Sequence, residues 1–156
     1  MLAARGIRAA SLSVRENKFG KPEFDPSLGL HFSISHSDGR VMVALSDRPV
    51  GCDVERIAPV QAEVLAEGLA PDERTAVEAL ADGRERDQAF CRLWTRKESY
   101  VKACGCGFSC DPKTISTLQD VVRTDFAFQD FEYEDGYMGC VCQRIRSACC
   151  AGDGTR

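Results

Sequence analysis

Hydrophobic and polar residues alternate along three short segments in the first third of the chain. A period of two is typical of strands, because successive side chains of a strand point to opposite faces. The pattern predicts strands at residues 30–35, 40–46 and 50–55, with turns at 36–39 and 47–49 between them. We expect the third strand to run antiparallel to the second.

The first 26 residues have a weaker pattern. The pattern at residues 5–14 is compatible with a strand. A loop is predicted at residues 17–26, because Gly20, Pro22 and Pro26 interrupt any regular element.

The middle of the chain has the spacing of helices. One helix is predicted after Pro59 and a second near Pro71, where the following acidic residues suit a helix N-terminus. The strongest prediction is a helix from about Arg84 to Ala103, ended by the glycines of residues 104–107. Its apolar side chains recur at helical spacing: Phe90, Leu93, Trp94 and Val101.

The last third returns to strands. Residues 126–134 and 137–143 flank Asp135-Gly136, and Asp-Gly between two such runs predicts a hairpin. Strands, then helices, then strands indicate an α+β fold with mainly antiparallel pairing. The length of 156 residues fits one domain, which we expect over residues 1–150 with a frayed tail at 151–156.

Composition and charge narrow the function classes. The chain is 44% hydrophobic and 28% charged, as in an ordinary globular domain. Its net charge of −4 provides no general attraction to nucleic acid or to an anionic membrane, so any anion site must be local. We expect a cytoplasmic protein, because residues 1–14 lack an export signal and no apolar run approaches the ~20 residues of a membrane span.

The chain contains 9 cysteines, an odd number. Without an export signal, this number predicts reduced thiols rather than a disulfide framework. The cluster at Cys104, Cys106 and Cys110 leaves open a zinc site, although paired CxxC spacing and a neighbouring histidine are missing.

Asp53 and Glu55 are the first candidates for chemistry. They are two residues apart on a predicted strand and therefore share a face. Two interpretations remain open: a solvated acidic strand end, or a pair of oxygen ligands for Mg²⁺, which commonly takes one or two carboxylates together with phosphate oxygens.

The long helix carries the second group of candidates. Trp94, Glu98 and Lys102 follow one another at intervals of four and form one ridge. Two interpretations remain open for this ridge. Glu98 and Lys102 form a simple ion pair, or Glu98 binds a metal or a proton while Lys97 or Lys102 binds a phosphate. Lys97 lies within the apolar stripe, so its ammonium group must either reach solvent or meet an anion.

Several blocks together resemble a known family. The blocks, in order, are Gly20-Lys21-Pro22, Phe32-Ser33-Ile34-Ser35-His36-Ser37, Gly51-Cys52-Asp53-Val54-Glu55, and residues 94–103 (WTRKESYVKA) followed by Gly105-Cys106-Gly107-Phe108. In order and spacing, the chain resembles the 4′-phosphopantetheinyl transferase superfamily over about residues 18–140, and most closely its Sfp-type branch. The combination of G-x-D-x-E with W-x-x-K-E-S-x-x-K is the specific part of this resemblance. It implies an antiparallel sheet packed on a long helix, with the first of two similar halves shortened, since only some 50 residues precede Gly51.

The resemblance also implies a reaction and its residues. Such a transferase, of the holo-acyl-carrier-protein synthase type, moves the 4′-phosphopantetheine arm of coenzyme A to a serine of an acyl or peptidyl carrier protein and releases 3′,5′-ADP. The Mg²⁺ ligands would be Asp53, Glu55 and Glu98. Glu98 would accept the serine proton, and Lys102 would stabilise the leaving phosphate. The predicted contacts to coenzyme A are Lys21, Ser35, His36, Lys97 and Lys102.

The partners follow from the same resemblance. Carrier proteins are generally acidic, so Arg92 and Arg96 on the outer face of the long helix would meet one, unless that face is simply solvated. We expect a monomer or a small homo-oligomer. The alternative function is a non-catalytic module that binds coenzyme A or a carrier protein on the same fold.

Overall fold

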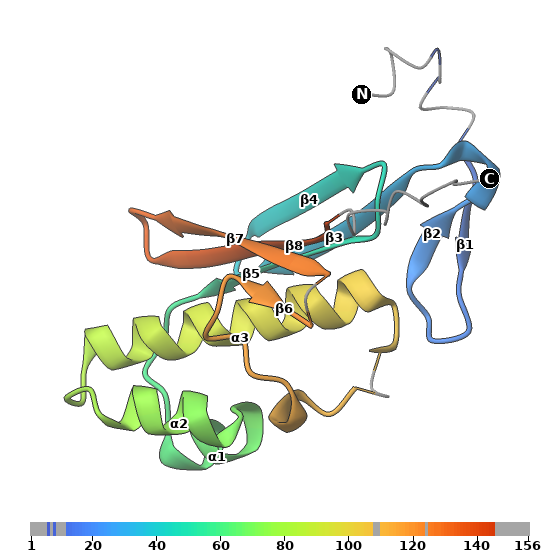
Figure 1. The fold of residues 1–156 in the computed structure, drawn as a ribbon. Coiled ribbons are helices and arrows are strands. Elements are labelled where there is room, and N and C mark those ends of the chain that lie inside the picture. Colours follow the sequence, from blue (N-terminus) through green and yellow to red (C-terminus); the bar gives the residue numbers. More distant parts are fainter. Residues whose placement is uncertain (1–5, 7, 9–11, 108–109, 124, 146–156) are drawn as a thin grey trace, which may run out of the picture.

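A computed structural model of the chain describes all residues except 1–5, 7, 9–11, 108–109, 124 and 146–156. Strands lie on one side of a long central helix, α3 (Arg84–Cys104), and two short helices lie on its other side (Figure 1). The short helices are α1 (Ala62–Gly68) and α2 (Pro71–Glu78). This arrangement confirms the predicted α+β class and the three predicted helices.

The largest sheet has four antiparallel strands in the order β5-β8-β7-β6. They are β5 (Val50–Arg56), β6 (Val121–Val122), β7 (Phe126–Tyr133) and β8 (Tyr137–Arg144). The hairpin predicted around Asp135-Gly136 is confirmed, with Tyr133 opposite Tyr137 and Gly136 at a φ of 84°. The order of the strands could not be foreseen: β5 pairs with β8, more than 80 residues further along the chain, and not with β4.

Two hairpins complete the described strands. The first joins β3 (His31–Ser37) to β4 (Arg40–Ser46) in antiparallel register. The second joins β1 (Val14–Glu16) to β2 (Pro22–Phe24), so the loop predicted at 17–26 is wrong for its second half. Half of the predicted strand at 5–14 lies outside the described residues, and in the other half only Val14 belongs to a strand, β1. The predicted tail at 151–156 lies wholly outside the described residues.

The β3–β4 hairpin has two different faces. Met42 and Ala44 pack on Val50 and Cys52 of β5, which buries one face. The opposite face is open, and Ile34, Val41 and Val43 are 48%, 65% and 63% exposed.

Helix α3 lies unusually close to β5. A side chain on Gly51 would overlap the carbonyl oxygen of Ser99 and lie 2.9 Å from the carbonyl carbon of Lys102. The helix ends at Gly105, whose φ of 65° is in the left-handed region and whose N–H bonds the carbonyl of Val101. The predicted role of this glycine as a helix stop is therefore confirmed.

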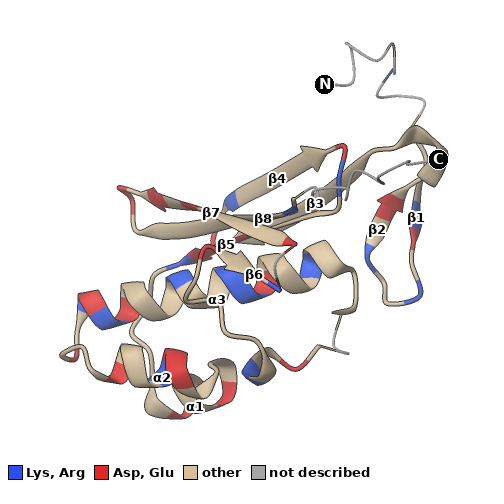
Figure 2. Cartoon of the chain, viewed as in Figure 1, with Lys and Arg blue, Asp and Glu red and all other residues tan. Residues whose placement is uncertain are grey.

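The charged and thiol side chains have distinct distributions. Acidic and basic residues are interspersed over the helices and hairpins in Figure 2. Seven cysteines are described as free thiols, of which Cys52, Cys91, Cys140 and Cys142 are buried. Burial raises the pKa of the Cys140 thiol to about 12, so this group acts as a small apolar side chain. Among the described residues, no helix has the length and apolarity that a membrane crossing requires.

Candidate active site

A row of serines connects β3 to β5. Ser33, Ser35 and Ser37 alternate along β3, so all three hydroxyls face the same neighbour. The Cys52 N–H donates to Ser33 Oγ at 3.1 Å, and Ser35 Oγ donates to Asp53 Oδ1 at 2.7 Å. Ser37 Oγ donates to Glu55 Oε2 at 2.8 Å. The sequence interpretation singled out Ser35 alone, although the period of two in Ser-Ile-Ser-His-Ser was visible.

Asp53 is the most buried of the candidate carboxylates, at 2% exposure. Besides Ser35, its Oδ1 atom accepts a hydrogen bond from Lys102 Nζ at 2.6 Å. Its Oδ2 atom is buried and has no hydrogen-bond partner among the described residues. A buried carboxylate oxygen without a partner is costly, and a bound cation or donor would remove that cost.

These side chains line one pocket of about 330 Å³ between β3, β5 and α3. Its lining residues are Ile34, Ser35, His36, Asp53, Glu55, Trp94, Glu98 and Lys102. The ridge predicted on the long helix therefore faces the acidic pair predicted on the strand. The structure brings together six of the eight residues that the sequence nominated for the site, counting Ser35, His36, Asp53, Glu55, Glu98 and Lys102.

The electrostatics of the pocket reflect its crowded carboxylates. The pKa of Glu98 is raised, mainly because burial disfavours its charge and further because Asp53 lies nearby, while Lys102 opposes the shift. The pKa of Glu55 is also raised by burial, against the hydrogen bond from Ser37. Among the described residues that line the pocket, three carboxylates are thus partly neutralised by one ammonium group, that of Lys102.

The donor set suits a hard cation such as Mg²⁺, since it consists of carboxylate oxygens and includes the unpartnered Oδ2 of Asp53. The positions are not those of a finished metal site: within the described residues, no three His, Cys, Asp or Glu side chains are grouped so as to hold an ion. Lys102 occupies one oxygen of Asp53 in this arrangement. The three-carboxylate ligand set therefore stays a prediction, and the same finding gives no support to zinc at Cys104, Cys106 and Cys110.

Lys21 lines a second pocket, of about 220 Å³, directly beside the first. Ile34 and Lys102 line both pockets, which places Lys21 one pocket away from the carboxylates. Its Nζ atom donates to the Val50 carbonyl at 3.3 Å. Burial lowers the pKa of Lys21, and Glu23 partly offsets this effect.

Comparison with known proteins identifies the family. Residues 49–142, more than half of the chain, match the 4′-phosphopantetheinyl transferase superfamily. This chain belongs to that superfamily. The matched region contains β5 and α3, and with them Asp53, Glu55, Glu98 and Lys102.

Curated relatives point to the Sfp-type branch of the superfamily. The chain is 40% identical over 107 residues to the 4′-phosphopantetheinyl transferase gsp of Aneurinibacillus migulanus, covering 69% of this chain and 44% of that protein. It is 34% identical over 135 residues to Sfp of Bacillus subtilis (80% and 60% covered) and 35% identical over 111 residues to AcpT of Escherichia coli K12 (67% and 56% covered). The chain spans about half the length of the curated relatives it matches.

Lys97, a predicted contact to coenzyme A, lies outside the pocket that contains the carboxylates. The lysine is 2% exposed and forms a buried ion pair with Glu73 of α2 at 2.6 Å. Its Nζ atom also donates to the carbonyl oxygen of Pro112 at 2.6 Å. The predicted contact between Lys97 and a coenzyme A phosphate is therefore wrong: the anion that this lysine meets is Glu73.

Replacing Lys97 by methionine is expected to lower the free energy of unfolding by about 3 to 5 kcal/mol, because Glu73 is left as an uncompensated buried charge. Denaturant unfolding measures this loss. The double variant Lys97→Met, Glu73→Gln should recover part of it, because the amide is neutral. The recovery is partial, because the Ala70 and Thr117 N–H groups bond separate oxygens of Glu73 and the single oxygen of glutamine can accept from only one of them. A Lys97→Met protein that keeps its stability but loses affinity for coenzyme A would contradict the structural role.

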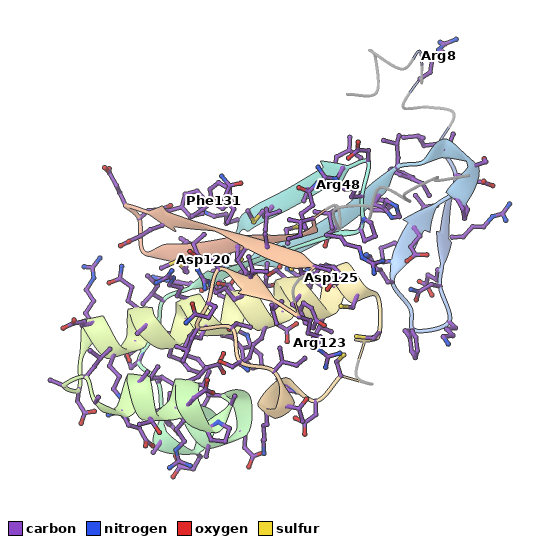
Figure 3. The ribbon with its side chains drawn as sticks, viewed as in Figure 1. Arg8, Arg48, Asp120, Arg123, Asp125 and Phe131 are labelled. Carbon is purple, nitrogen blue, oxygen red and sulfur yellow. The ribbon has the colours of Figure 1, made fainter. Side chains whose placement is uncertain are left out.

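Arg96 is the second correction. It is 2% exposed and pairs with Asp130 and Asp120, each at 2.7 Å. Its Nη1 atom also donates to the Thr117 carbonyl at 2.8 Å. Figure 3 labels Asp120, which directly precedes β6 over α3. Arg96 therefore ties α3 to the sheet and is not available to a carrier protein, whereas Arg92 is half-exposed and also pairs with Asp130.

An apolar pocket of about 520 Å³ adjoins the carboxylates on the side of α1. Val60, Val64, Phe90 and Trp94 are among its lining residues, together with Glu55. Glu55 and Trp94 line this pocket and the carboxylate pocket alike. Local sequence patterns do not indicate this pocket, because its walls come from β5, the loop that follows it and two helices, which only the tertiary fold brings together.

Proposed function

We propose that this chain transfers the 4′-phosphopantetheine arm of coenzyme A to a serine of an acyl or peptidyl carrier protein, in a Mg²⁺-dependent reaction that releases 3′,5′-ADP. One observation carries the proposal: Asp53, Glu55, Glu98 and Lys102 line a single pocket although they come from a strand and a helix far apart in sequence. Membership of the superfamily and the names of the relatives support the same chemistry.

In the proposed reaction, the serine Oγ of the carrier attacks the β-phosphorus of coenzyme A, and the bond from that phosphorus to the 3′,5′-ADP oxygen breaks. Glu98 accepts the serine proton. Beside a bound divalent ion, this carboxylate would stay ionised at neutral pH and able to accept a proton. Lys102 stabilises the charge that develops on the leaving phosphate.

Asp53, Glu55 and Glu98 would hold Mg²⁺, with the unpartnered Oδ2 of Asp53 as the clearest free ligand atom. Bound there, the ion would neutralise pyrophosphate charge that a protein of net charge −4 does not otherwise balance. Lys102 would have to release Asp53 to reach a phosphate, and its side chain is 30% exposed, so it has room to move.

Coenzyme A would lie across the two adjoining pockets. Ser35, His36 and Lys102 line the carboxylate pocket, and Lys21 lines its neighbour, so both contain donors for phosphate oxygens. The cytoplasmic location and the monomer or small homo-oligomer predicted from the sequence remain part of this proposal.

One observation favours the rival function, a module that binds coenzyme A or a carrier without catalysis. It is the lack of a preformed three-ligand metal group among the described side chains. The rival predicts binding without chemical change in either partner.

The test is to incubate the protein with an apo-carrier, coenzyme A and Mg²⁺, and to measure the intact mass of the carrier. We expect a gain of one phosphopantetheine group, abolished in Glu98→Gln. The matched control is Glu85→Gln, the same substitution on the exposed first turn of α3 outside the pocket, which should transfer normally. If acyl and peptidyl carriers both stay unmodified while coenzyme A binds, the rival function is correct.

A further inference from the structure

The last serine of β3 contacts a candidate metal ligand without itself lining the pocket. Ser37 Oγ donates to Glu55 Oε2 at 2.8 Å and accepts a hydrogen bond from the Arg56 N–H at 3.3 Å. A hydroxyl has one proton to donate, so this serine is committed to Glu55. Its two partners are consecutive residues of β5, which fixes both the carboxylate and the backbone that carries it.

Glu55 needs such a contact more than Asp53 does. Asp53 has two donors, Ser35 and Lys102, and is almost fully buried. Glu55 has a longer side chain near the end of β5, is half-buried, and has Ser37 as the one side-chain donor described for it. Asp53 lies two residues earlier on β5 and lines the same pocket, so repulsion between the like charges favours a Glu55 conformation that turns away from the other carboxylates.

A second space is available to the Glu55 side chain beside the carboxylate pocket. Glu55 lines the apolar pocket beside α1 as well as the carboxylate pocket. Rotation of its side chain would carry the carboxylate from one to the other. The Ser37 bond opposes that rotation, because it holds Oε2 on the side of β3.

Resting on the proposed function, we propose that Ser37 is a positioning residue that holds the Glu55 carboxylate in the cation site. Ser35 and Ser37 of β3 make the same kind of hydrogen bond to β5. Each serine donates to the β5 carboxylate 18 residues further on, at Asp53 and at Glu55. Ser35 lines the pocket and can touch a substrate, whereas Ser37 acts through Glu55.

Cation binding tests this role directly, with Mn²⁺ as the probe and electron paramagnetic resonance to measure the free ion. Loss of a hydrogen bond to a metal-binding carboxylate typically weakens metal affinity at least about 10-fold, and we expect that weakening for Ser37→Ala. Ser37→Thr keeps the hydroxyl on a strand residue and should bind Mn²⁺ as the unmodified protein does. In the carrier mass assay, the Mg²⁺ concentration for half-maximal transfer should rise by the same factor in Ser37→Ala and not in Ser37→Thr.

Ser33→Ala is the matched control, because Ser33 also links β3 to β5 but bonds the Cys52 N–H and not a carboxylate. It should lower thermal stability and leave Mn²⁺ affinity unchanged. Equal Mn²⁺ affinity in Ser37→Ala and the unmodified protein, or equal losses in Ser37→Ala and Ser33→Ala, would refute the positioning role alone. An unmodified protein that neither binds Mn²⁺ nor modifies a carrier would instead refute the proposed function, and the inference with it.

Discussion

Replacing Asp53 by alanine is expected to abolish phosphopantetheine transfer while the protein remains folded. The substitution removes Oδ2, the one buried carboxylate oxygen without a hydrogen-bond partner in the described part of the chain. Since loss of a group that only supports a metal ligand costs 10–100-fold, loss of a ligand itself should reduce the rate by at least about 100-fold. The carrier mass assay gives the rate, and thermal unfolding gives the stability.

The fold should tolerate this change. The ammonium group of Lys102 loses its carboxylate partner but keeps its hydrogen bond to Ser35 Oγ at 3.1 Å, and at 30% exposure it can also turn towards water. The pKa of Glu98 is raised mainly by burial and further by Asp53, and the removal of that negative charge relieves the second of these effects. The matched control is Asp120→Ala, which removes a carboxylate that pairs with Arg96 outside the pocket and is 79% exposed; its transfer rate should be normal. If Asp53→Ala unfolds at ordinary temperature, Asp53 is structural and the ligand assignment fails.

Local patterns predicted the elements well, for a physical reason. Helical spacing and strand alternation are set by neighbours within a few residues, so the three helices and the β7–β8 hairpin could be placed in advance. The ridge of Trp94, Glu98 and Lys102 also follows from local geometry. Its position opposite Asp53 and Glu55 came from the family resemblance, and the structure places all of them around one pocket.

Partners from distant segments could not be predicted in the same way. The apolar stripe around Lys97 predicts that its ammonium group either reaches solvent or meets an anion, but nothing local identifies Glu73, 24 residues earlier, as that anion. Helix spacing alone predicts that Arg96 lies on an outer face. It does not show that Asp120 and Asp130 cover this face, because their position over α3 depends on sheet topology. Partner choice for a buried charge is a property of the tertiary fold, which spacing alone does not encode.

Gly51 belongs to the motif that predicts the family, but the sequence alone does not explain why a glycine is required at this position. It opens the G-x-D-x-E block, and the resemblance used it only as part of a pattern. The structure supplies the reason: β5 and α3 approach so closely here that only a residue without a side chain fits. The glycine thereby sets the distance between the strand that carries Asp53 and the helix that carries Glu98.

Gly51→Ala is accordingly expected to lower the free energy of unfolding by several kcal/mol, because a methyl group there overlaps the backbone of α3 at Ser99 and Ala103. Backbone cannot rotate aside as a flexible side chain can, so the helix must move away from the strand. That loss is a large part of the ~5–15 kcal/mol that stabilises a typical domain, and denaturant unfolding would measure it.

Gly139→Ala is the matched control, on the neighbouring strand of the same sheet. A methyl group at Gly139 would lie 3.4 Å from its nearest neighbours, the Asp53 carbonyl oxygen, Met42 and Tyr133, which is ordinary van der Waals contact. This variant should keep nearly the stability of the unmodified protein, because the added atom needs no movement of α3.

The Gly51→Ala protein that remains folded should also transfer phosphopantetheine more slowly per molecule, since a helix displaced at Ser99 carries the adjacent Glu98 away from Asp53. Equal stability of the two alanine variants would mean that β5 and α3 do not approach as closely as described, and the shared pocket would lose its structural basis.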